Sequence, residues 1–87
     1  MNYNLHLIDC TGRHYVFDLN KHTLEIHINN DHMLLHAGDN NVQQKFLELY
    51  KQVLVNKHSM CVITPESCVM LHADQIVGAQ LLPSDNH

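Results

Sequence analysis

The chain has 87 residues and a formal net charge of −4, with 45% hydrophobic but only 16% charged residues. This length predicts one domain with a small core. Five Lys and Arg residues are too few for the basic surface that nucleic acid requires, and the longest apolar runs are too short to span a membrane. We therefore expect neither nucleic acid nor a membrane as partner.

Two alternating segments near the start of the chain predict a β-hairpin. Residues 3–7 and 15–19 each place a large apolar side chain at every second position. Gly12 lies in the break between them, where it suits a three-residue loop that needs a left-handed residue. Pairing across this loop puts Leu5 opposite Phe17 and all the large side chains on one face.

A second hairpin is predicted from residues 24–28 and 33–37, which alternate in the same way. We expect a two-residue turn at Asn30-Asp31, with Ile28 opposite Met33. A register that differs by one residue would turn the apolar side chains outward.

The only clear helical period follows at residues 39–57. Asp39, Asn40 or Asn41 is expected to accept hydrogen bonds from the first free backbone N–H groups. The spacing of three and four predicts that one face of this helix is buried. That face consists of Val42, Phe46, Leu49, Tyr50 and Val53.

The last third of the chain predicts short strands. Residues 60–63 and 68–71 are apolar at consecutive positions, which is typical of strands that are buried on both sides. Residues 76–82 read as a further strand, and residues 84–87 as a frayed tail.

Together these elements predict a single α+β domain over residues 1–83. It contains two N-terminal β-hairpins, one amphipathic helix and then two or three short strands. The expected architecture is a mostly antiparallel sheet packed against a single helix.

Three cysteines at no disulfide-framework spacing, with no signal segment before the first strand, predict a reduced, cytoplasmic setting. Cys61, Cys68 and His72 could form a site of thiolates and imidazole, but their apolar surroundings favour buried structural cysteines. Cys10, in a turn beside Arg13, is the expected reactive thiol. No recognisable set of nucleophile, base and pocket accompanies it, so we do not expect an enzyme.

Nine histidines are the unusual feature of the composition. His27, His32 and His36 are expected on one solvent-facing side of the second hairpin, where they could hold a divalent metal ion. His6 and His14 lie at outward positions of the first hairpin. Because no metal signature or cofactor motif matches, we predict no metal site and no cofactor, and favour polar surface residues.

Leu47 and Leu54 fall at the flank of the apolar helix face and Leu34 points to the polar side of its hairpin, so these three are candidates for a contact surface. We therefore predict a small non-enzymatic binding or regulatory domain that acts through a protein partner or self-association, for example as a homodimer. The alternative is a histidine-based metal-binding or pH-responsive protein.

Residues 24–51 also resemble the middle of some small phage anti-CRISPR proteins that block Cas9. The likeness rests on a strand that ends in Asn29-Asn30-Asp31, a second strand, and a helix with Lys45-Phe46 and Tyr50-Lys51. It implies a bacterial or phage inhibitor that binds a host protein. The dense acidic surface of those proteins is missing from this sequence, and no site residue is carried over.

Overall fold

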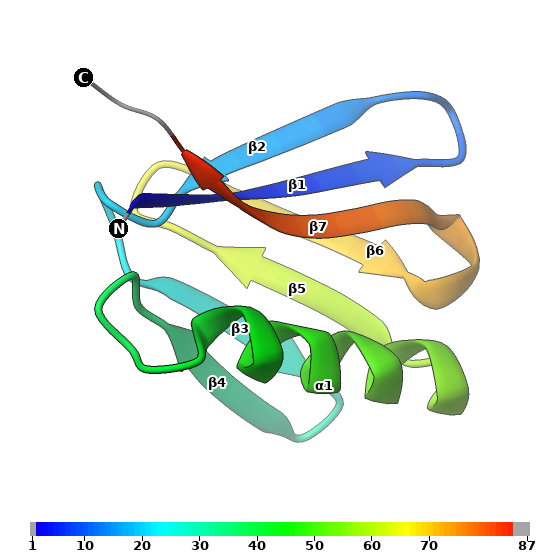
Figure 1. The fold of residues 1–87 in the computed structure, drawn as a ribbon. Helices are drawn as coiled ribbons and strands as arrows, with labels where there is room; N and C mark the ends of the chain where they lie inside the picture. Colours follow the sequence, from blue (N-terminus) through cyan, green and yellow to red (C-terminus); the bar gives the residue numbers. More distant parts are fainter. Residues whose placement is uncertain (1, 85–87) are drawn as a thin grey trace.

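The computed structural model describes residues 2–84 as two antiparallel sheets that pack with one helix (Figure 1). The elements in chain order are β1 (Asn2–Asp9), β2 (His14–Asp18), β3 (Leu24–Ile28), β4 (Asp31–Leu35), α1 (Val42–Asn56), β5 (Ser59–Ile63), β6 (Cys68–His72), the 3₁₀ helix η1 (Ala73–Gln75) and β7 (Ile76–Ser84). The predicted α+β class and antiparallel pairing are confirmed.

The strands divide into two sheets. Sheet A has the order β2-β1-β7, and sheet B has the order β4-β3-β5-β6. The first and last strands of the chain are therefore neighbours, with Leu5 opposite Leu81. One core lies between the two sheets and α1, with buried residues from every strand and both helices.

The first hairpin is confirmed in its register. Leu5 pairs with Phe17, and the Arg13 carbonyl accepts a hydrogen bond of 3.0 Å from the Asp9 N–H. Gly12 has a φ of 86°, the left-handed conformation that the loop requires.

The predicted turn of the second hairpin is wrong by one residue, which shifts the strand pairing by two residues. The loop is Asn29-Asn30 rather than Asn30-Asp31, so that Ile28 pairs with Asp31 and Ile26 with Met33. Asn29 takes the left-handed conformation, with φ 56°, which asparagine tolerates better than most residues. A two-residue shift preserves the face on which each side chain lies, so the apolar face still points to the core.

Helix α1 begins at Val42, three residues later than expected. Asn41 precedes it in a left-handed conformation and makes no side-chain cap hydrogen bond, so the predicted capping role is wrong for this residue. The predicted buried face is confirmed, since Val42, Phe46, Leu49 and Val53 are buried. Tyr50 is half-buried.

Polar side chains of α1 reach the outer strands of both sheets. Gln43 Nε2 donates a 3.1 Å hydrogen bond to the Leu81 carbonyl on β7, and Lys45 Nζ donates a 3.0 Å hydrogen bond to the Leu34 carbonyl on β4. In Figure 1, α1 lies below β7 and in front of the β3–β4 ribbon. The helix therefore connects one edge of sheet A with one edge of sheet B.

The prediction that residues 60–63 and 68–71 are buried on both sides is wrong. Met60 and Val62 point into the core, whereas Cys68 and Met70 are exposed. The single helix and sheet A cover the inner face of sheet B, which leaves no layer for its outer face.

At the chain end, β7 continues to Ser84, which pairs with Asn2, so the expected tail does not begin at residue 84. Residues 85–87 of that expected tail lie outside the described residues. Within residues 2–84, no helix combines the length and apolar character needed to cross a bilayer.

Candidate functional site

The outer face of sheet B brings together two of the three predicted histidines. His27 and His32 are cross-strand partners, and their rings stack with centroids 5.5 Å apart and planes 25° apart. His27 Nε2 also donates a hydrogen bond of 2.9 Å to Glu25 Oε1. This carboxylate fixes the orientation of the His27 ring.

His36 does not join this pair. It lies beyond the end of β4, where its Nδ1 accepts a 3.0 Å hydrogen bond from the Gly38 N–H. Across residues 2–84, no three His, Cys, Asp or Glu side chains gather closely enough to hold a metal ion. The structure therefore does not assemble the three-histidine cluster considered from the sequence.

The cysteines of sheet B lie close together and are less buried than expected. Cys61 is half-buried and Cys68 is exposed, so the prediction of buried structural cysteines is wrong for Cys68. Their Sγ atoms are 3.3 Å apart. Burial, followed by the Cys68 thiol, raises the pKa of the Cys61 thiol to about 11. Cys61 is therefore a protonated and poorly nucleophilic thiol at neutral pH.

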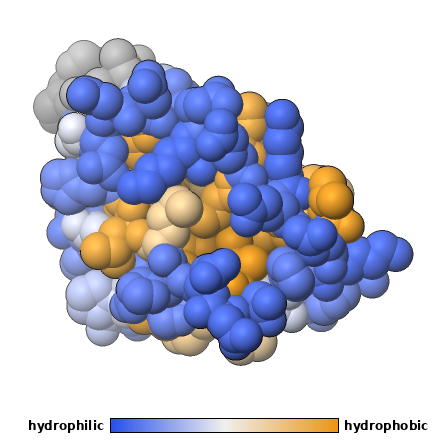
Figure 2. All heavy atoms as spheres, turned by 90° about the horizontal axis from the view of Figure 1, so that it is seen from below, coloured by the Kyte–Doolittle hydropathy of each residue, from blue (hydrophilic) through white to orange (hydrophobic). Residues whose placement is uncertain are grey.

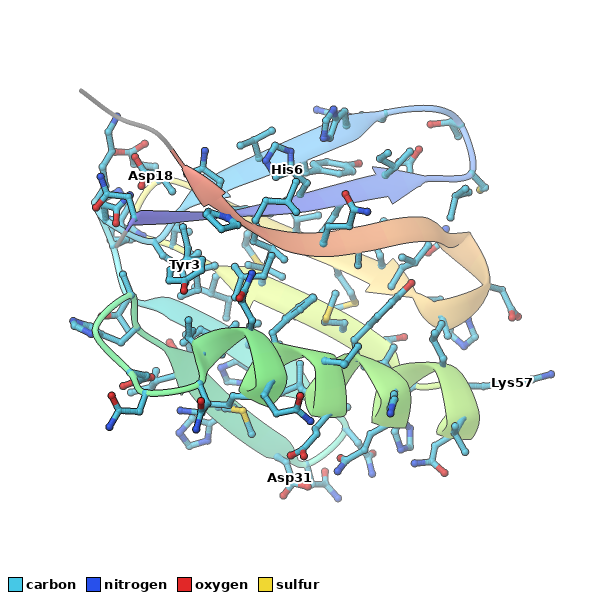
Figure 3. The ribbon with its side chains drawn as sticks, in the orientation of Figure 1. Tyr3, His6, Asp18, Asp31 and Lys57 are labelled. Atoms are coloured by element: carbon cyan, nitrogen blue, oxygen red, sulfur yellow. The ribbon has the colours of Figure 1, made fainter. Side chains whose placement is uncertain are left out.

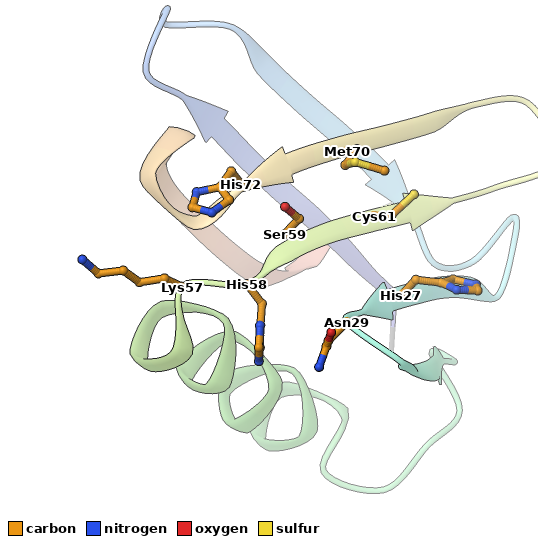
Figure 4. Close-up of a pocket in the computed structure, with 8 residues that line it drawn as sticks. All are labelled: His27, Asn29, Lys57, His58, Ser59, Cys61, Met70 and His72. Atoms are coloured by element: carbon orange, nitrogen blue, oxygen red, sulfur yellow. The ribbon is translucent and has the colours of Figure 1, made fainter.

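A shallow hollow of about 340 Å³ lies on this face beside Cys61 (Figure 4). Its lining residues come from β3, β5 and β6, from the turn after β3 and from the chain between α1 and β5. They are His27, Asn29, Lys57, His58, Ser59, Cys61, Met70 and His72. Figure 4 shows Cys61 between Met70 on β6 and His27 on β3.

His72, the third member of the proposed thiolate and imidazole site, has a structural role at the start of η1. Its Nδ1 accepts a 3.3 Å hydrogen bond from the Asp74 N–H. Its own N–H donates a 2.9 Å hydrogen bond to Gln75 Oε1. This reciprocal pair is a capping box, which explains the histidine without a ligand.

The predicted contact residues Leu34, Leu47 and Leu54 are exposed, but they do not line one common surface hollow. Leu34 lines a hollow at the outer face of sheet B beside Glu25 and Ile63. Leu47 lines a different hollow, between α1 and β7.

A further hollow of about 300 Å³, with a mixed polar and apolar lining, lies between α1 and the β3–β4 ribbon. Leu49 borders it on the helix and Met33 borders it on β4. In Figure 2, hydrophobic surface is visible in the middle of the lower face, bordered by hydrophilic residues.

The outer face of sheet A carries exposed apolar side chains that were not predicted from the sequence. We call Ile8, Val16, Val77 and Leu82 the sheet A patch. These side chains are 39%, 54%, 69% and 41% exposed. Three of them line a hollow of about 570 Å³ that has no Lys, Arg, Asp or Glu in its wall. Ile8 and Val16 occupy outward positions of the alternating strands, and this sequence pattern could have predicted their exposure.

Two histidines complete this face. His6 Nδ1 and His14 Nε2 are 3.1 Å apart, and His6 lies on β1 in sheet A (Figure 3). One nitrogen must donate the hydrogen and the other must accept it. This contact therefore exists only while at least one of the two rings is neutral.

Asp9 holds the end of the first hairpin beside this face. Its carboxylate is buried and accepts hydrogen bonds from the Thr11 hydroxyl, the Thr11 and Arg13 N–H groups and the Tyr15 hydroxyl. These bonds, that of the Thr11 side chain above all, lower the pKa of Asp9 despite the opposing effect of burial. Asp9 is thus a structural anion of the turn.

The described surface therefore offers two features: an aliphatic patch on sheet A and a group of histidine and sulfur side chains on sheet B. Cys10 is exposed in the turn, as expected, and Cys68 is exposed as well.

Comparison of the chain with protein-family models, curated proteins and solved structures finds no match.

Proposed function

We propose that this chain is a small, non-enzymatic, cytoplasmic binding domain that contacts another protein through the sheet A patch. The observation that carries the proposal is the exposure of Ile8, Val16, Val77 and Leu82 on one sheet face. Exposed aliphatic side chains that lie singly are normal. Here Ile8, Val77 and Leu82 line one hollow, which favours a contact surface, with the polar partners His6 of Val16 and Asn4 of Leu82 on the same face.

The character of the face supports a protein partner. The hollow at the patch contains no formally charged side chain apart from any protonated histidine, and uncharged aliphatic centres are typical of protein interfaces. Nucleic acid is disfavoured because the whole chain has only five Lys and Arg residues. The first partner to test is a second copy of the chain, since that test needs no other protein.

The experiment compares two lysine substitutions. Val16→Lys adds a charge to the patch, and Val55→Lys adds the same charge to an exposed position of α1, where the valine is 79% exposed. We expect sedimentation to show concentration-dependent association of the wild type and of Val55→Lys, but not of Val16→Lys. Circular dichroism checks that all three chains are folded.

A second arm covers a partner other than the chain itself. Each chain is used as bait, and the captured proteins are compared between Val16→Lys and Val55→Lys. The proposal is wrong if the wild type stays monomeric at high micromolar concentration and both variants capture the same proteins as the wild type.

A further inference from the structure

Three sulfur-bearing side chains share the outer face of sheet B, away from the sheet A patch. Cys61 on β5 is the direct cross-strand partner of Met70 on β6, so their side chains leave the same face of the sheet. Cys68 lies two residues before Met70 and shares this face. Its Sγ atom is 3.3 Å from that of Cys61.

The register disfavours a disulfide between the two cysteines. Ile63, not Cys61, is the direct partner of Cys68, so the cysteines are diagonal neighbours. Diagonal positions are about 7–8 Å apart, whereas residues more than about 7 Å apart at Cα cannot be bridged without backbone movement. The short Sγ separation therefore comes from side chains that point toward each other.

A bridging ion fits this geometry better than a covalent bond. Two sulfurs that each bind one metal ion at about 2.3 Å can lie up to about 4.6 Å apart. The observed distance of 3.3 Å between the two Sγ atoms is below this limit. Rotation of the exposed Cys68 side chain can increase the distance between the two sulfurs. The pair can thus hold one ion while the backbone keeps its pairing.

The ligand chemistry selects a soft ion. Thiolate and thioether sulfur bind Cu(I) well, whereas a structural zinc ion requires four ligands of sulfur, nitrogen or oxygen. The neighbouring Glu25 carboxylate already accepts the hydrogen bond from His27. Within the described chain no group of three His, Cys, Asp or Glu side chains exists that could begin a zinc site.

We propose that Cys61, Cys68 and Met70 form a binding site for one Cu(I) ion. Cu(I) displaces the protons of both thiols to solvent, including that of Cys61, which is protonated in the free chain; two sulfur–copper bonds form, and the neutral Met70 thioether supplies the third ligand. No electron is transferred, because the copper arrives and stays as Cu(I). His27 flanks the site as the other cross-strand neighbour of Cys61.

The test is an anaerobic competition for Cu(I) between the apo chain and a coloured Cu(I) chelator. We expect one Cu(I) per chain, with thiolate-to-copper charge-transfer absorption in the ultraviolet. Cys68→Ser should weaken Cu(I) binding by more than about 100-fold. Loss of a residue that only hydrogen-bonds to a metal ligand already weakens metal binding by about 10–100-fold, and Cys68 is itself a ligand. Met70→Leu should weaken Cu(I) binding by about 10–100-fold.

Cys10→Ser is the matched control, because it removes an exposed thiol that lies on the other sheet's hairpin. It should leave the stoichiometry and the affinity unchanged. Cys68 is exposed, so its serine variant keeps the core intact even if Cys61→Ser fails to fold. Cu(I) binding that survives Cys68→Ser, or Zn(II) binding of equal affinity, would overturn the proposal.

Discussion

Truncation of Phe46 to alanine tests whether α1 closes the core between the two sheets. Phe46 is 3% exposed, and its ring stacks on that of Tyr50, with ring centroids 5.9 Å apart and planes 8° apart. Removing a buried phenylalanine ring costs about 3–5 kcal/mol, of which the aromatic pair accounts for about 0.5–1.5 kcal/mol. A chain of this length has a free energy of unfolding of about 4–13 kcal/mol. The variant should therefore lose a large part of its stability.

Urea unfolding followed by circular dichroism measures this loss. Leu47→Ala is the matched control, because Leu47 is the next residue of the same helix but is 45% exposed. We expect it to change the free energy of unfolding by less than about 1 kcal/mol. A Phe46→Ala effect as small as that of the control would refute the placement of α1 over the core.

Three further predictions concern single side chains. The lowered pKa of Asp9 gives stability that is present above its ordinary value of 3.8 and is lost as the pH falls through the lower folded value. Asp9→Asn should therefore be less stable than the wild type at pH 7, and urea unfolding should show a smaller difference between pH 7 and pH 3. Lys57→Gly should raise the free energy of unfolding by about 0.5 kcal/mol, and with it the thermal midpoint, because φ 54° suits glycine and the relieved backbone strain exceeds the extra chain entropy of glycine. A lower midpoint would contradict that backbone conformation. In alkylation at pH 8 followed by mass spectrometry, Cys61 should react more slowly than Cys10, because its pKa is raised. Cys68→Ser removes one cause of that raised pKa and should therefore accelerate the alkylation of Cys61. Equal rates at Cys61 with and without Cys68 would count against the contact.

Local signals predicted the first hairpin and the helix face well. Gly12 readily adopts the left-handed conformation that the three-residue loop needs, and the alternation of large side chains around it leaves one register that places them all on one face. The face of α1 follows from its period alone. These features depend on neighbours in the sequence.

The second hairpin shows why a turn can be misplaced when two candidates are chemically similar. Asn29-Asn30 and Asn30-Asp31 both suit a two-residue loop, and both registers keep the apolar face inward. The difference matters for the histidines. In the observed register His27 lies opposite His32, and β3 has no residue left to pair with His36.

Long-range pairing could not be read from the sequence. The division into two sheets arises because β7 pairs with β1 and β5 pairs with β3, across long segments of chain. Without that information, the apolar run around Cys68 looked like a strand covered on both sides. The exposed position of Met70, and with it the grouping of three sulfurs, follows only from the arrangement of the sheets.

The pairing of the first strand with the last also determines how the domain can form during synthesis. The two hairpins and α1 can develop from local contacts, but β1 obtains its second neighbour only when residues 76–84 have left the ribosome. Such distant contacts form late, because closing a long loop costs conformational entropy before the contacts can stabilise it. A nascent chain that ends at Gln75 therefore leaves one side of β1 open to pairing with other chains.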